Sequence, residues 1–133
     1  MKRKKLIRLL LSLTTMTCCP APAASDSGFS KITPEQAKQM MESQPAPFIL
    51  DVREQDEFAT GHIRGAKLLP LSTIRPNSAA QLIPDKDQTV LVYCRSGNRS
   101  KQASEKLVKL GYTNIIEIGG INSWPGETVT GDK

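Results

Sequence analysis

The stretch Thr89-Val90-Leu91-Val92-Tyr93-Cys94-Arg95-Ser96-Gly97-Asn98-Arg99-Ser100 decides the fold. It opens with β-branched and aromatic residues in a run without polar alternation, which is typical of a parallel strand covered on both faces. A short polar loop follows, and then an amphipathic helix over 100–110 with alanine and leucine inward and lysines outward. Gly111 ends that helix. A strand, loop and helix in this order predict an α/β fold.

The rest of the chain repeats this alternation. A helix is predicted to begin at Pro34, with Thr33 as its N-cap and Gln36 completing a capping box. Further short strands are predicted at 29–32, 48–52, 66–69 and 114–118. We therefore expect one domain over 29–130, built as a three-layer α/β sandwich whose mostly parallel sheet is covered by helices on both faces.

The first residues indicate an export signal. A basic start leads into the apolar run 6–13, and the small residues that follow suit cleavage after Ala23. The apolar run is far shorter than the roughly 20 residues that span a bilayer. We therefore expect a signal peptide over 1–23, a polar linker over 24–28, a periplasmic protein and no membrane attachment after cleavage. A lesser alternative is a lipoprotein processed at Cys18.

The net charge of +5 does not indicate a nucleic-acid partner. Five of the 18 Lys and Arg residues lie within the first eight positions, and the other 13 balance the 13 Asp and Glu residues. The body of the protein is therefore neutral, and we predict no nucleic-acid binding.

Three cysteines are present, and two of them, Cys18 and Cys19, leave with the leader if cleavage follows Ala23. Cys94 then has no partner for an internal disulfide. It is either an inert buried thiol or a reactive one, and its surroundings favour the second. It lies at the carboxyl end of a strand, where ligands bind in open α/β sheets.

The loop after Cys94 is suited to an anion. Gly97 and Asn98 can both adopt positive φ, so backbone N–H groups can point at a common centre. The helix start and the charges of Arg95 and Arg99 add to this positive field, which favours a thiolate. The predicted catalytic residue is therefore Cys94, and the predicted substrate-binding residues are Arg95, Ser96, Gly97, Asn98 and Arg99.

Several charged residues have open roles. We expect Arg95 to attract an anion at the mouth of the site. Arg99 could contact the anion or fix the loop through an ion pair with an acidic group. Asp51 and Arg53 are expected to fix loop geometry, and His62 to be structural. No His, Cys and carboxylate residues have metal-ligand spacing, so we predict neither a metal nor a cofactor.

Three motifs together resemble the rhodanese family of sulfurtransferases over roughly 32–126. The first, beginning Asp51-Val52-Arg53, continues through Gly61-His62-Ile63-Arg64-Gly65-Ala66. The second is Cys94-Arg95-Ser96-Gly97-Asn98-Arg99-Ser100, and the third is Gly119-Gly120 followed by Trp124. With the export signal, the chain looks most like the periplasmic single-domain rhodaneses of the phage-shock-protein-E type. It departs from the family at Pro125-Gly126-Glu127, where members usually continue a helix.

The resemblance implies a double displacement. Cys94 takes sulfur from a small anionic donor such as thiosulfate, its persulfide is held by the amides of residues 95–99, and the sulfur passes to cyanide or another thiophilic acceptor. The expected protein is a monomeric enzyme; the alternative is a sulfur-carrier or redox module loaded by a specific donor protein. Phosphatase and arsenate-reductase relatives place the arginine six positions after the cysteine. Arg99 follows by five, so the smaller ring favours one sulfur atom.

Overall fold

The computed structural model describes residues 28–131. The predicted signal peptide, its cleavage site and lipid attachment at Cys18 lie outside these residues. Within them, no helix is long and apolar enough to cross a membrane.

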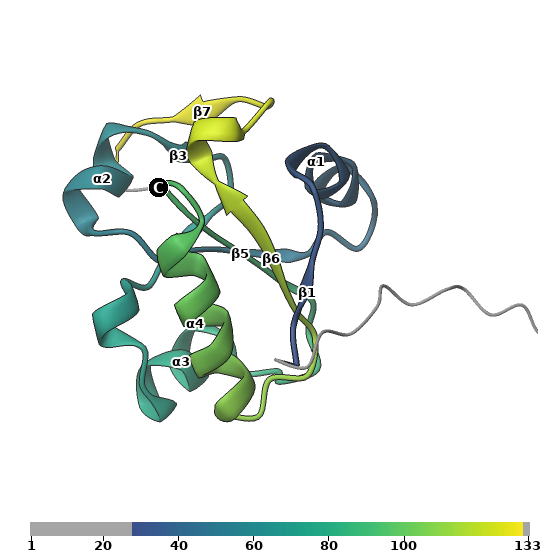
Figure 1. The fold of residues 1–133 in the computed structure, drawn as a ribbon, viewed down its shortest axis with the longest axis vertical. Coiled ribbons are helices and arrows are strands. Elements are labelled where there is room, and N and C mark those ends of the chain that lie inside the picture. The colour runs from purple at the N-terminus through teal and green to yellow at the C-terminus, as the bar shows by residue number, and fades with distance from the viewer. Residues whose placement is uncertain (1–27, 132–133) are drawn as a thin grey trace, which may run out of the picture.

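A parallel sheet forms the centre of the described chain (Figure 1). Within residues 28–131 its five strands run in the order β1 (Ser30–Lys31), β6 (Ile115–Gly120), β5 (Val90–Cys94), β2 (Phe48–Asp51) and β4 (Lys67–Leu68). Every neighbouring pair is parallel, and Val92 lies in register with Leu50 on one side and Glu117 on the other. The predicted parallel sheet is therefore confirmed.

Strand β5 is buried on both of its faces. Val90, Val92 and Cys94 belong to one hydrophobic core, whereas Leu91 and Tyr93 belong to the other. All five side chains are at most 1% exposed. This is why the strand shows no polar alternation, since both directions of a period-two pattern meet apolar neighbours.

Helices cover both faces of the sheet. Ala37 of α1 (Pro34–Glu42) and Phe58 of α2 (Gln55–Thr60) pack into the core that contains Tyr93. Ala79 of α3 (Pro76–Leu82) and Leu107 of α4 (Asn98–Lys109) pack into the core on the opposite face. The predicted three-layer sandwich is therefore confirmed.

The predicted start of α1 is confirmed, whereas α4 starts earlier than predicted. The capping box of α1 is confirmed: Thr33 Oγ1 accepts from the Gln36 N–H at 3.1 Å, and Gln36 Oε1 accepts from the Thr33 N–H at 3.0 Å. The last long helix, α4, starts at Asn98, two residues before the expected Ser100. Gly97, the residue before the helix, has a φ of 107°, in the left-handed region that favours glycine. The expectation of positive φ at Asn98 is wrong, because this residue is already helical.

The segment after β6 folds back across the molecule. A short 3-10 turn, η2 (Ile121–Ser123), leads to β7 (Thr128–Val129), which pairs antiparallel with β3 (His62–Ile63). The Gly131 N–H then donates to the Ala59 carbonyl at 3.0 Å. The other 3-10 turn of the described residues, η1 (Leu71–Thr73), lies earlier in the chain, before α3. The chain after Trp124 therefore forms a strand at the position where a continued helix is usual in the resembled family.

Candidate active site

Cys94 is the last residue of β5, and the loop that follows it packs against the end of β6. The Arg95 carbonyl accepts from the Asn122 N–H at 3.2 Å. A Cβ atom on Gly120 would overlap this same carbonyl group. Glycine at position 120 thus lets the loop lie against β6, which gives a physical reason for the Gly119-Gly120 motif.

The sulfur of Cys94 faces the inside of the loop. Its residue is 1% exposed, and Sγ accepts a hydrogen bond from the Gly97 N–H at 3.0 Å. The Ser100 hydroxyl lies 3.6 Å from the same sulfur. The sulfur therefore accepts an N–H hydrogen bond at the residue that precedes the start of α4.

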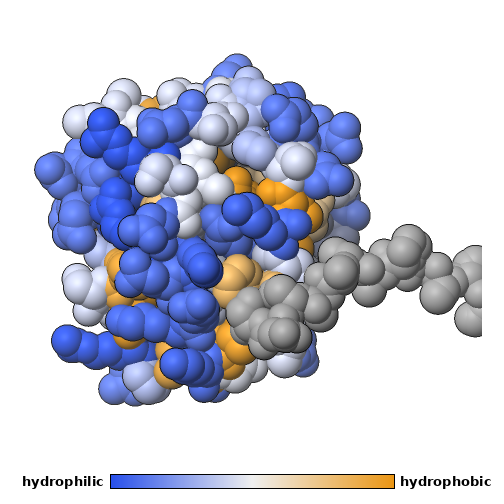
Figure 2. All heavy atoms as spheres, viewed as in Figure 1, coloured by the Kyte–Doolittle hydropathy of each residue, from blue (hydrophilic) through white to orange (hydrophobic). Residues whose placement is uncertain are grey.

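The outer part of the loop is open to solvent. Arg95, Ser96 and Asn98 are exposed. Ser96 also lines a cavity of about 490 Å³, together with Lys31, Ile32, Thr33, Pro34, Gln36, Ile118, Gly119, Gly120 and Ser123. Figure 2 shows hydrophobic surface between α1 and the end of β6, on the side where this cavity opens. A ligand approaching the loop from this side would meet a largely apolar wall.

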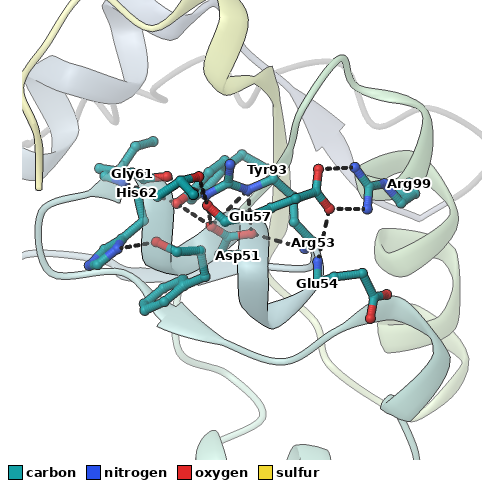
Figure 3. A network of polar contacts seen from close by, with 11 residues as sticks. Asp51, Arg53, Glu54, Glu57, Gly61, His62, Tyr93 and Arg99 are labelled. Atoms are coloured by element: carbon teal, nitrogen blue, oxygen red, sulfur yellow. Dashed lines mark hydrogen bonds and ion pairs between the residues drawn. The ribbon is translucent and has the colours of Figure 1, made fainter. Parts of the chain in front are cut away.

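Arg99 is engaged by an acid from another element. Its Nη1 and Nη2 donate to Glu57 Oε1 and Oε2 at 2.8 and 3.0 Å, as Figure 3 shows. The hydrogen bond from Arg99 lowers the pKa of Glu57 to about 2. Of the two roles left open by the sequence, Arg99 adopts the ion pair in this structure, and it ties α4 to α2.

Asp51 is fully buried and carries a dense set of hydrogen bonds (Figure 3). Its Oδ2 accepts from Arg53 Nη2 and from the Tyr93 hydroxyl, both at 2.6 Å. Arg53 Nη2 also donates to the Gly61 carbonyl at 2.7 Å. Burial, followed by the charge of Asp51, raises the pKa of Tyr93. These contacts fix the path of the chain after β2, in line with the expectation for Asp51 and Arg53.

His62 is part of the packing on the same side. It is fully buried, its ring stacks on Phe58 with centroids 3.7 Å apart, and its Nδ1 lies 2.9 Å from the Phe58 carbonyl. Trp124 packs against the core that holds Phe58 and donates from Nε1 to the Glu127 carbonyl at 3.3 Å. Both side chains therefore have structural surroundings.

One polar residue near the loop was missed by sequence reasoning. Glu117 is 2% exposed, in the middle of β6. Its Oε2 accepts from the Ser100 hydroxyl at 2.6 Å and from the Gly119 N–H at 2.8 Å. The available signal was an acid inside the apolar run Ile115-Ile116-Glu117-Ile118, where burial of an unpaired charge is costly.

Comparisons with known proteins agree with this arrangement. Residues 33–127 match the family model described as Rhodanese-like domain. The chain is 39% identical over 72 residues to Thiosulfate sulfurtransferase PspE of Escherichia coli (strain K12), covering 54% of this chain and 68% of that protein. It is 35% identical over 113 residues to Thiosulfate sulfurtransferase GlpE of Pseudomonas putida (strain F1), covering 80% and 97%. The solved structure titled "rhodanese with anions from E. coli" matches with a TM-score of 0.61 and 36% identity, covering 65% and 100%.

Proposed function

The chain belongs to the rhodanese family and is a sulfurtransferase, and we propose that it is an exported enzyme that moves sulfur from thiosulfate to cyanide or another thiophilic acceptor through a persulfide on Cys94. The observation that carries this proposal is the loop around one sulfur atom. A buried thiol receives the Gly97 N–H at 3.0 Å and lies beside the start of α4. A reacting sulfur anion needs these partners.

In the first step, the Cys94 thiolate attacks the outer sulfur of thiosulfate. A bond forms between Sγ and that sulfur, the sulfur–sulfur bond of thiosulfate breaks, and sulfite leaves with the electron pair. In the second step, cyanide attacks the outer sulfur of the persulfide, and thiocyanate leaves while the electron pair returns to Sγ. The charge of the enzyme is the same in each state, so one field of N–H groups and cations serves both steps.

The two arginines have different parts in this proposal. Arg95 is exposed beside the loop and attracts the doubly negative donor. Arg99 holds the loop through Glu57, while its positive charge stays close enough to Cys94 to interact with it. The exposed Ser96 and Asn98 border the entry, and Gly97 supplies the N–H at its base.

The decisive experiment measures thiocyanate from thiosulfate and cyanide. The wild-type chain turns over, and Cys94→Ser loses turnover. Equal thiocyanate from both proteins would refute the proposal.

Arg95→Gln raises the KM for thiosulfate with a smaller change in kcat, because it removes the attraction between the arginine and the anion and leaves the thiol intact. Lys101→Gln, a charge removed from the exposed side of α4, is the matched control and leaves the KM close to the wild-type value.

The alternative, a carrier loaded by a specific donor protein, uses the same thiol. The apolar cavity beside Ser96 favours it, since a protein surface could dock there. A carrier would gain sulfur only when cell extract is added, whereas the proposed enzyme gains it from thiosulfate alone.

Export and oligomeric state complete the proposal. We propose that residues 1–23 direct the chain to the periplasm and are removed, that 24–28 is a linker, and that the domain over 29–130 acts as a monomer. The mass of the chain recovered from the periplasmic fraction tests the cleavage after Ala23. Light scattering of that material tests the monomer.

A further inference from the structure

Glu117 is a buried acid that the two sulfur-transfer steps do not use. Its Oε2 accepts from Ser100 Oγ at 2.6 Å and from the Gly119 N–H at 2.8 Å. Its Oε1 faces Lys31 Nζ at 3.7 Å, but the Lys31 side chain is 74% exposed. The strongest hydrogen bond that this carboxylate receives from a side chain therefore comes from Ser100, the residue whose hydroxyl also approaches the reactive sulfur.

The Ser100 hydroxyl connects the acid to the thiol. Its Oγ lies 3.6 Å from Cys94 Sγ and 2.6 Å from Glu117 Oε2, and it also approaches the Gly97 and Gly119 carbonyls at 3.0 and 3.3 Å. A hydroxyl has one proton to donate, and it can accept another hydrogen bond at the same time. When Cys94 is a thiol, its S–H can donate to Ser100 while Ser100 donates to an ionised Glu117. When Cys94 is a thiolate, Ser100 can donate to sulfur while it accepts from a protonated Glu117.

The surrounding groups can compensate the negative charge in either arrangement. A negative charge on Cys94 lies beside the Gly97 N–H, the start of α4 and the positive field of Arg99, whose own charge is partly balanced by Glu57. The same charge on Glu117 has the Ser100 hydroxyl at 2.6 Å, the Gly119 N–H at 2.8 Å and the exposed Lys31 at 3.7 Å. A negative charge therefore has hydrogen-bond donors and a cation at either end of the path, so the proton can pass between the sulfur and the carboxylate.

We propose that Glu117 accepts the Cys94 proton through Ser100, so that the thiolate forms without release of a proton to solvent. The S–H bond breaks as its proton passes to Ser100 Oγ, and the proton of Ser100 forms an O–H bond with Glu117 Oε2. The negative charge moves from the carboxylate to the sulfur. Glu117 does not touch the sulfur and acts on it only through Ser100. The inference rests on the proposed role of Cys94.

The test is a pH titration of the thiolate ultraviolet absorbance in the full chain. Each protein is compared with its Cys94→Ser counterpart, which cancels the signals of Cys18 and Cys19. Glutamine at position 117 keeps the size of the side chain but cannot take the proton. In Glu117→Gln we expect the thiolate absorbance at neutral pH to fall by about threefold or more. This fall corresponds to a shift of the titration curve to higher pH by about half a unit or more.

The opposite result overturns the inference. If Glu117 were only a negative charge near the sulfur, its removal would favour the thiolate, so a Glu117→Gln signal equal to or above wild type refutes proton transfer. Glu117→Asp is the second variant in case Glu117→Gln does not fold. It keeps the charge but withdraws the carboxylate from Ser100, so the signal falls if the proton passes this way and stays at the wild-type level if only charge matters.

Ser100→Ala tests the path itself. It leaves the carboxylate in place and removes the bridging hydroxyl, so we expect the same fall, and no further fall in the double variant with Glu117→Gln. A wild-type signal in Ser100→Ala refutes the path. Because the titration uses no sulfur donor, its outcome is separate from the thiocyanate assay. Wild-type turnover with an unchanged Glu117→Gln signal rejects this inference alone.

Discussion

Asp51 and Glu117 are both buried carboxylates, on the two strands that flank β5, and the chain neutralises them differently. Asp51 receives a guanidinium from Arg53 and the Tyr93 hydroxyl, both at 2.6 Å and both buried. Glu117 receives a hydroxyl and an N–H, and its nearest cation, Lys31, is exposed at 3.7 Å. Removing a buried cation leaves its buried acid without charge compensation, whereas an exposed cation beside a buried acid contributes little to stability.

The contrast also divides the molecule into a scaffold and a site. The Asp51 cluster fixes the chain around α2 and β3 on one side of the sheet. The Glu117 contacts lie against the loop that carries Cys94. The Glu57–Arg99 ion pair joins the two sides. Changes on the scaffold side should therefore affect stability first, and changes on the site side should affect sulfur chemistry first.

The largest effect is expected from Arg53→Met. It leaves Asp51 buried without its cation, which should lower the free energy of unfolding by about 3–5 kcal/mol. Lys31→Met, the equivalent change beside Glu117, should cost no more than about 1 kcal/mol because that pair is exposed on one side. Denaturant unfolding of both variants measures the difference. Equal losses would remove the distinction between the two carboxylates.

The next largest effect is expected from Gly120→Ala, which should lower the rate of thiocyanate production by displacing the loop that carries Cys94. Its Cβ would meet the Arg95 carbonyl, so the loop must move, and a displacement of about 1 Å can cost about 100-fold in rate. Gly61→Ala is the matched control on the Asp51 side. Gly61 has an extended φ of 164° and open space around a Cβ, so its thiocyanate production should stay near wild type. A Gly120→Ala enzyme of wild-type rate would contradict the packing described for the loop.

The smallest effect is expected from the Glu57–Arg99 ion pair, whose contribution to the free energy of unfolding should depend on pH. Because Arg99 holds the Glu57 pKa at about 2, below the ordinary 4.5, the ion pair stabilises the fold above about pH 4.5 and loses this contribution as the pH falls toward 2. At neutral pH, Glu57→Gln should cost about 1 kcal/mol, since the pair is partly exposed. The gap between wild type and variant should close in acid, and a gap that is constant with pH would count against the ion pair.

Much of the fold could be predicted from local patterns. The buried strands appear as apolar runs, and Thr33 and Gln36 mark the start of α1 through contacts three residues apart. The β3 and β7 pair could not be predicted, because strands of two residues carry no period and their partners are far apart in the chain. The start of α4 was misplaced since Asn98 is compatible with both a turn and a helix.

The candidate site divides in the same way. The loop and its cysteine could be recognised because their residues are contiguous. The partners that tune it come from elsewhere: Glu57 is 42 residues from Arg99, and Glu117 is 17 residues from Ser100. Such pairs are created by the sheet order, in which β6 lies beside β5. Sequence left open whether Arg99 contacts the anion or an acidic group, and the fold pairs it with Glu57.

The most direct test of sulfur transfer through Cys94 is the intact mass of the full chain after treatment with thiosulfate. We expect the wild type to gain the mass of one sulfur atom, cyanide to reverse this gain, and Cys94→Ser to show no gain. No added mass in the wild type, or the same added mass in Cys94→Ser through Cys18 or Cys19, would contradict it.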